Sequence, residues 1–219
     1  MKKRSRTGQK RQQTHKGKNL PSTKRSDIQS AEIKTLIQRI VDESPARGHL
    51  DISSASFPDL PLSKDTLVGL RDNAFKHMTR IQRIAIPHAL AGRDVLGAAK
   101  TGSGKTLAFL IPTLEKLYRE RWGEGDGVGA LIISPTRELA LQIFEVLRKL
   151  AKRHVGMTAA LITGGKDFSS EQDHIARMVS VEGVVFCGLL LIFWSVVARC
   201  TKVPILIGAT PYQLHLLSY

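Results

Sequence analysis

The chain has 219 residues, enough to bury a sizeable core in one domain or a little more. Its formal net charge of +14 and pI of about 10.1 are unusual for a simple metabolic enzyme and indicate polyanionic partners. The two cysteines, Cys187 and Cys200, have neither CxxC spacing nor a partner histidine, which argues against a disulfide framework and a zinc site.

The first 25 residues form a basic arm. They hold ten Lys or Arg and no Asp or Glu, so we expect this arm to be disordered. It is either a solvated solubility tail or a nuclear or nucleolar address that also contacts RNA phosphates. A secretory signal is not expected, because no apolar stretch follows the basic start.

A helix is predicted from a cap at Ser26-Asp27 to about Glu43, because apolar residues recur there at helical spacing. Such a stripe is more typical of packing than of function; it consists of Ile33, Leu36, Ile37, Ile40 and Val41. Residues 44–48 break the helix, so 1–49 are assigned to the arm and this helix. A compact domain is expected to begin near Phe57.

Helices and strands alternate from Phe57 onward. Helices are predicted at 63–73, 79–91, 106–121 and 137–153, and strands at 94–98, 130–134 and 157–162. The strands are nearly continuous apolar runs, so we predict an α/β fold with a parallel sheet covered on both faces. Ligands then gather at the carboxyl ends of the strands.

Residues 99–106, Ala-Lys-Thr-Gly-Ser-Gly-Lys-Thr, read as a phosphate-binding loop between a strand and a helix. Glycines let backbone N–H groups close on phosphate oxygens, and the helix adds its positive N-terminal end. Lys105 can reach the β and γ phosphates, and the Thr106 hydroxyl can hold Mg²⁺. The general pattern starts with glycine where this chain has Ala99, but the strand–loop–helix context favours a nucleotide site over a chance glycine turn.

A glutamine and a phenylalanine upstream of the phosphate-binding loop are candidates for binding the base of the nucleotide. A glutamine amide donates to and accepts from an adenine edge together, so Gln82 is interpreted as an adenine reader rather than an ordinary helix residue. The aromatic Phe57 can stack on that base.

Two further segments are candidates for contacts with the RNA backbone. Residues 135–140 follow a strand directly and place a helix N-terminus at the ligand edge of the sheet. Thr136 can simply cap that helix, but Arg137 suits an RNA phosphate. The pair Gly164-Gly165 would let a nucleic-acid backbone approach closely, although such a pair is usually a turn.

Taken together, residues 57–178 resemble the ATP-binding domain of DEAD-box ATP-dependent RNA helicases. The resemblance rests on Phe57, the glutamine motif ending in Gln82, motif I at 99–106, motif Ia at 135–140 and Gly164-Gly165. Ala99 is what this family normally shows, whereas Ala74 and Met78 replace the glycine and proline common in the glutamine motif. The residues around these motifs resemble those of the nucleolar members of the family, which act in small-subunit ribosomal RNA maturation.

The resemblance implies a partial RecA-like domain that binds ATP and Mg²⁺ and contacts the RNA backbone with little sequence specificity. It assigns ATP binding to Phe57, Phe75, Gln82, Ala99, Thr101, Gly102, Ser103, Gly104, Lys105 and Thr106. Lys105 and Thr106 would be catalytic, with Thr106 holding Mg²⁺. RNA binding is assigned to Pro135, Thr136, Arg137, Gly164 and Gly165. The resemblance further implies a role in ribosome biogenesis, pre-ribosomal particles as partners and a location in the nucleus, within the nucleolus.

The family pattern is expected to stop at Met178. The Thr-Pro-Gly-Arg, Asp-Glu-Ala-Asp and Ser-Ala-Thr motifs and a second RecA-like domain are absent, and we treat Asp42-Glu43 and Gly208–Thr210 as coincidences. Without the acidic pair and an arginine finger, hydrolysis by this chain should be very poor. A non-catalytic RNA-binding or regulatory fragment is therefore the rival to a helicase part.

Residues 179–219 form an apolar tail with three interpretations. A membrane helix is disfavoured, because the apolar run of 183–198 is short of the ~20 residues that a span needs. A buried strand pair is the second. We favour a translated non-family segment, such as a retained intron, because Val179-Ser180 is what a splice donor encodes; the chain would then be a truncated product.

Overall fold

The computed structural model describes residues 22–47, 56–122, 126, 128–162, 183–187, 205–209 and 213–218. Its helices are α1 (Ser22–Glu43), the short 3-10 helix η1 (Phe57–Asp59), α2 (Lys64–Asp72), α3 (Arg80–Leu90), α4 (Lys105–Glu120) and α5 (Arg137–Ala151). Its strands are β1 (Val95–Ala98), β2 (Val128–Ile133), β3 (Ala159–Ile162), β4 (Gly183–Cys187), β5 (Ile205–Ala209) and β6 (Gln213–Ser218). The expectations for the basic arm before Ser22 lie outside the described residues.

The strands form one mixed sheet in the order β1-β6-β5-β2-β4-β3. Strand β2 pairs in parallel with β4 and β5, and β3 pairs in parallel with β4. Strand β6 is antiparallel to both β1 and β5, so the prediction of a wholly parallel sheet is wrong at this strand. The reason is chain length: only residues 210–212 connect β5 to β6, whereas a parallel crossover needs a dozen or more.

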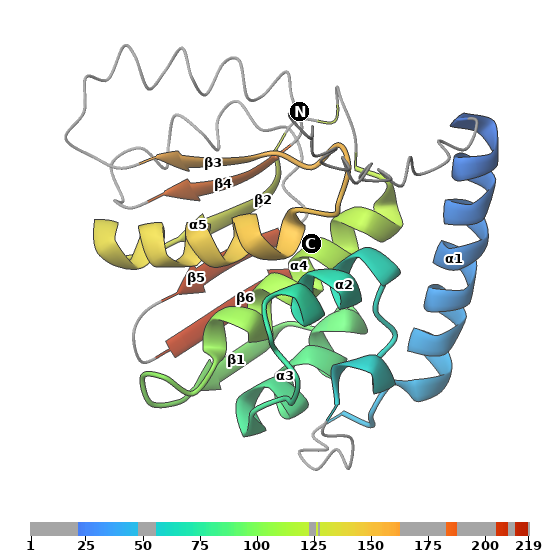
Figure 1. Ribbon diagram of the computed structural model, residues 1–219. Coiled ribbons are helices and arrows are strands. Elements are labelled where there is room, and N and C mark those ends of the chain that lie inside the picture. Colours follow the sequence, from blue (N-terminus) through green and yellow to red (C-terminus); the bar gives the residue numbers. More distant parts are fainter. Residues whose placement is uncertain are drawn as a thin grey trace, which may run out of the picture.

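The described helices pack on one side of the sheet. Helices α3, α4 and α5 contact strands, and α2 packs on α4 and α5 (Figure 1). The described residues therefore place helices on one face, and coverage of the other face stays a prediction. The main core lies between this helical layer and the sheet, and its largest fully buried side chains include Phe109, Leu110, Ile111, Leu114 and Ile132.

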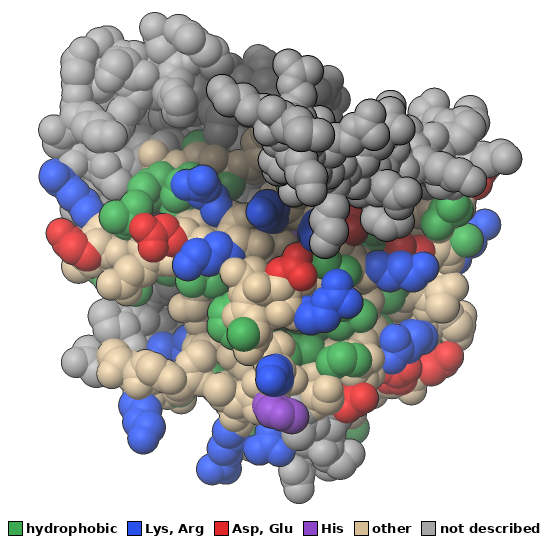
Figure 2. Space-filling model, in the orientation of Figure 1, with side chains coloured by type: hydrophobic (Ala, Val, Ile, Leu, Met, Phe, Trp, Pro, Cys, Tyr) green, Lys and Arg blue, Asp and Glu red, His purple; other side chains and the backbone are tan. Residues whose placement is uncertain are grey.

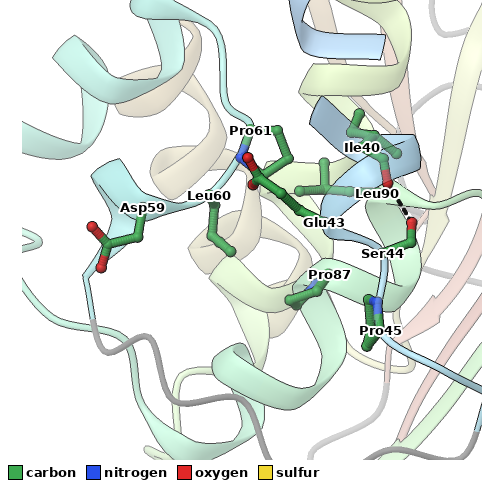
Figure 3. A pocket seen from close by; sticks show the side chains of 9 residues that line it. All are labelled: Ile40, Glu43, Ser44, Pro45, Asp59, Leu60, Pro61, Pro87 and Leu90. Carbon is green, nitrogen blue, oxygen red and sulfur yellow. Dashed lines mark hydrogen bonds between the residues drawn. The ribbon is translucent and has the colours of Figure 1, made fainter. Parts of the chain in front are cut away.

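Helix α1 begins at Ser22, before the predicted cap at Ser26-Asp27. Its buried stripe is narrower than predicted, since Ile37 and Val41 are 49% and 68% exposed. The helix packs on the domain through Ile33 and Leu36, which join Tyr118 in a small apolar cluster. A cavity of about 180 Å³ lies between the C-terminal end of α1 and the rest of the domain (Figure 3). It is lined by Ile40, Glu43, Ser44, Pro45, Asp59, Leu60, Pro61, Pro87 and Leu90.

The apolar tail contributes three strands to the sheet. Residues 183–187, 205–209 and 213–218 pair with β1, β2, β3 or each other. Of the three interpretations of this segment, strands of the sheet is the one that the described residues support. Among those residues, no helix combines the length and the apolar character that crossing a membrane requires.

Candidate nucleotide-binding site

The phosphate loop connects β1 to α4 as predicted. Strand β1 ends at Ala98, α4 begins at Lys105, and the loop between them turns through two glycines in the left-handed region, Gly102 with φ +75° and Gly104 with φ +89°. A Cβ atom at Gly104 would also run into the side-chain amide of Gln82 and would lie 3.0 Å from Thr79 Oγ1. Glycine is therefore required here both by backbone conformation and by space.

Lys105 folds back over its own loop. Its Nζ donates hydrogen bonds to the carbonyl oxygens of Ala99 at 2.5 Å and Lys100 at 2.8 Å. An ammonium has three N–H donors, so one remains for a phosphate oxygen. Partial desolvation lowers the pKa of Lys105 from its ordinary value. The two carbonyls thus hold the positive charge at the loop before any ligand arrives.

Gln82 fastens the glutamine motif to the phosphate loop. Its Oε1 accepts from Thr79 N at 2.8 Å, and its Nε2 donates to the carbonyl oxygen of Gly104 at 3.0 Å. The residue is 2% exposed. Each end of the amide retains one unused hydrogen-bonding position. Contact between Gln82 and an adenine edge stays a prediction, but the residue already positions the loop.

The two phenylalanines assigned to the base, Phe57 and Phe75, both line a cavity of about 360 Å³. Leu67, Leu70 and Lys76 also line it. Phe57 is 1% exposed and belongs to the main core, although it also lines this cavity, and its stacking on a base stays a prediction. Phe75 is only partly buried, which makes its ring the available stacking surface.

The remaining loop residues differ in access. Thr101 and Gly102 are exposed, whereas Ser103 and Thr106 are half-buried. The Ser103 hydroxyl is buried and has no hydrogen-bond partner among the described residues, so it can bond to a phosphate oxygen at the loop. Thr106 stands in the first turn of α4, where its hydroxyl can serve as one oxygen ligand of Mg²⁺.

Acidic groups do not reach the loop from the neighbouring strand. Strand β6 runs antiparallel to β1 and places Gln213 beside Ala98, and residues 213–218 include no Asp or Glu. Within the described residues, no cluster of three or more His, Cys, Asp or Glu side chains could hold a metal ion. For Mg²⁺ the loop thus presents the Thr106 hydroxyl, and β6 adds no carboxylate beside it.

The second predicted motif lies at the same edge of the sheet, at the β2–α5 junction (Figure 1). Pro135, Thr136 and Arg137 are all exposed. Thr136 caps α5, since its Oγ1 accepts a hydrogen bond from Leu139 N at 3.2 Å. The Arg137 side chain has no hydrogen-bond or ion-pair partner among the described residues. Gly164 and Gly165 lie outside the described residues.

Two residues near the loop were not predicted as site residues. Thr79 supplies the N–H that orients Gln82, and the carbonyl of Lys100 holds Lys105. Thr79 precedes Gln82 by three residues at a helix start, which is the capping-box spacing and could have identified it. The role of Lys100 has no sequence signal, because it uses the backbone.

Comparison with known proteins gives a consistent picture. The family model described as DEAD/DEAH box helicase matches residues 79–193. ATP-dependent RNA helicase dbp4 of Aspergillus oryzae is 56% identical over 167 residues, covering 74% of this chain and 20% of that protein. ATP-dependent RNA helicase DBP4 of Kluyveromyces lactis is 54% identical over 149 residues, covering 68% and 19%.

A solved structure also matches. The DEAD-box helicase Mss116 bound to ssRNA and UDP-BeF has a TM-score of 0.53 and 29% identity, and the match covers 61% of this chain and 27% of that one. The chain spans about a fifth of the length of the curated relatives it matches. The family match passes Met178 and ends at 193, while the origin of residues 179–219 stays a prediction.

Proposed function

This chain belongs to the DEAD/DEAH box helicase family, and from that membership we propose that it supplies the adenine-nucleotide-binding part of an ATP-dependent RNA helicase. The phosphates lie on the loop of residues 99–106, with the third N–H of Lys105 on a phosphate oxygen and Thr106 as a Mg²⁺ ligand. Mg²⁺ there neutralises charge on the β and γ phosphates.

The hydrogen bond from Gln82 Nε2 to Gly104 O is the observation that carries this proposal. It connects the motif assigned to the base with the loop assigned to the phosphates, at 3.0 Å and in a part-buried position. A base at Phe75 and a triphosphate at Lys105 then belong to one ligand. The unused positions of the Gln82 amide match the N6 amino group and N7 of adenine, where guanine presents a carbonyl instead.

RNA is proposed to contact the β2–α5 edge. Arg137 is exposed there, and the N-terminal end of α5 attracts phosphate oxygens. Pro135 and Thr136 shape this turn, and Gly164-Gly165 would add a close approach to the backbone. Contacts of this kind go to sugar and phosphate, so we expect little sequence specificity.

Hydrolysis is proposed to be very slow in this chain. Orientation of the attacking water and neutralisation of the transition-state charge come from carboxylates and an arginine finger, and the described site holds neither. This chain matches only about a fifth of the length of the relatives named ATP-dependent RNA helicase, so their whole activity is not assigned to this chain. A non-catalytic RNA-binding fragment is the second candidate, favoured by the antiparallel β6 beside the phosphate loop.

The biological setting is proposed from the resemblance alone. A nucleolar location, ribosome biogenesis and pre-ribosomal particles as partners agree with the basic arm of residues 1–25 and with the +14 charge. Imaging of the tagged chain tests the location: nucleolar signal is expected, and uniform cytoplasmic signal contradicts it.

Titration with ATP and GTP under identical conditions tests the nucleotide assignment. We expect ATP to bind more tightly, and coincident curves would remove the adenine assignment. RNA binding is tested separately with single-stranded RNA at several salt concentrations. The basic arm should dominate it through counterion release, so deletion of residues 1–25 should lower both affinity and salt slope. An unchanged slope would identify the arm as a solubility or targeting element.

A further inference from the structure

The C-terminal ends of α2 and α5 meet in a tightly packed corner. A Cβ atom at Gly69 would lie 2.5 Å from the carbonyl oxygen of Leu150, so the two backbones are as close as glycine permits. The Asn73 side chain donates to the carbonyl oxygens of Gly69 at 2.8 Å and Lys149 at 3.3 Å. These contacts fix the last turns of both helices relative to one another.

Five basic side chains surround this corner, and we name them the α2–α5 basic patch: Arg71, Arg148, Lys149, Lys152 and Arg153. All five are exposed. Figure 2 shows Lys and Arg side chains over the face where α5 and α2 lie. From Val146 to Ile162 the chain contains no Asp or Glu. The positive charge of the corner is therefore not balanced from its own segment.

Asp72 neutralises only part of the patch. It lies 3.2 Å from the Arg153 guanidinium and 3.9 Å from that of Arg71. Arg148, Lys149 and Lys152 have no side-chain ion pair or hydrogen bond within the described residues. Basic residues commonly complement the negative end of a helix, but that effect falls off within the last turn and does not need this many cations.

We propose that the α2–α5 basic patch is a second RNA contact, which holds the phosphates of RNA flanking the strand at Arg137. This inference rests on the proposed RNA-binding function. The patch has Lys and Arg, the residues that phosphates recruit, and it lacks the aromatic anchors on which protein interfaces are built. RNA is thus a better fit than an acidic protein.

The patch is separate from the RNA edge at the start of α5. A helix of 15 residues is about 22 Å long, so the two sites stand at its opposite ends. Between them Glu138, Leu141 and Glu145 are exposed, and the two carboxylates would repel a strand lying along the helix. The patch therefore takes a different segment of the same RNA, such as an adjoining hairpin.

Neutralising the three unpaired cations tests this inference. The patch variant is Arg148→Gln, Lys149→Gln and Lys152→Gln, which leaves both partners of Asp72 in place. The control removes the same charge from exposed positions elsewhere: Lys34→Gln, Arg47→Gln and Lys64→Gln. Both variants are made in the full chain, and their melting temperatures are compared with the parent to show that they fold.

The probe is a labelled RNA hairpin with a single-stranded extension, titrated at several salt concentrations. We expect the patch variant to bind the hairpin about tenfold more weakly at low salt and to lower the log–log salt slope by about two, because each lost phosphate contact removes roughly 0.7 to 0.9. The control should change both quantities by less than half as much. The extension alone should bind both variants alike.

The outcomes separate the two claims. Equal losses in patch and control variants overturn the patch while leaving RNA binding intact. Polyglutamate, titrated in parallel, stands for an acidic protein. If the patch variant loses polyglutamate binding but keeps hairpin binding, the patch is assigned to an acidic protein and the RNA proposal is overturned. If the parent chain binds neither RNA, the proposed function fails together with this inference.

Discussion

The two ends of α4 stand in opposite surroundings. At its start, Lys105 and an exposed loop carry a spare N–H, an unpartnered Ser103 hydroxyl and two glycines with positive φ. Toward its end, Glu115 is fully buried, and its Oε1 accepts from Ser63 N at 2.9 Å and Ser63 Oγ at 2.7 Å. One helix thus keeps hydrogen-bonding groups available at one end and uses them for stability at the other.

The difference separates binding from folding. Groups that a ligand will use are held ready by neighbours, as Lys105 is held by loop carbonyls, and their loss should change affinity with little effect on stability. Groups inside the α2–α4 junction mostly pair with one another, although Glu115 Oε2 and His154 Nδ1 have no hydrogen-bond partner among the described residues. Loss of Glu115 should leave buried partners unpaired. Substitutions at the two ends should therefore give distinct outcomes.

The largest effect is expected at the buried end. Glu115→Ala removes the acceptor of two Ser63 donors and leaves a cavity, so unfolding free energy should fall by about 3 to 4 kcal/mol. Burial raises the pKa of Glu115, which favours its neutral form, so the uncharged Glu115→Gln should cost less than about 1 kcal/mol. Denaturant unfolding measures both. Equal losses for the two variants would show that charge, not hydrogen bonding, matters there.

Lys105→Ala should give the reverse pattern. We expect ATP affinity to fall about 100-fold, because charge-assisted bonds to phosphate are lost. The melting temperature should stay close to that of the parent, since Lys105 is partly exposed and its removal frees two carbonyls that water can reach. Fluorescent-nucleotide titration and thermal melting check the two halves of this prediction. A large loss of stability with unchanged affinity would contradict the assignment of this end to ligand binding.

His154 should make the buried end sensitive to acid. Burial lowers its pKa to about 4, and its Nε2 lies 2.9 Å from Thr66 Oγ1. A depressed histidine pKa means that the unfolded chain takes up the proton first, so stability is complete above pH 6.5 and is lost as pH falls toward 4. Roughly 2 kcal/mol should disappear between pH 6.5 and 4.5.

The variant His154→Gln isolates that contribution. Its stability should vary less with pH across this window than that of the parent, whereas the exposed control His77→Gln should keep the parental pH dependence. Parallel curves for the parent and His154→Gln would rule out His154 as the acid-sensitive group.

Gln82→Ala should give the smallest effect and a mixed one. The preference for ATP over GTP should fall by about tenfold, because a paired hydrogen bond to the base is worth about 1 to 3 kcal/mol. Stability should also decline slightly, since Thr79 N and Gly104 O lose their partner. Competition titrations measure the ratio. An undiminished ratio would show that Gln82 serves the loop alone.

The phosphate loop was predictable because its information is local. The glycines, Lys105 and the flanking strand and helix lie within a few turns of one another, and the structure places them as the sequence predicts. The cap by Thr136 was likewise foreseen as the plain interpretation, and the structure bears it out.

Features set by distant parts of the chain were not predictable. The burial of Phe57 depends on the core that forms around it, and the bond from Gln82 to Gly104 joins residues 22 positions apart. The antiparallel direction of β6 depends on its pairing with β1, which lies far away in the sequence. An apolar tail also gives no periodic signal that distinguishes a strand from a buried helix. Composition alone therefore left strands as only one of three interpretations of the segment that contains β4, β5 and β6.

Steady-state phosphate release tests the central claim most directly, namely that the described residues hold ATP at the loop and supply no group that hydrolyses it. Release is measured with and without single-stranded RNA, using Lys105→Ala as the blank. We expect no RNA-stimulated release above that blank, since an absent arginine finger alone costs about 10³ to 10⁵ in rate. Robust RNA-dependent turnover above the blank would contradict the account, because carboxylates would then have to reach the loop from elsewhere in the chain.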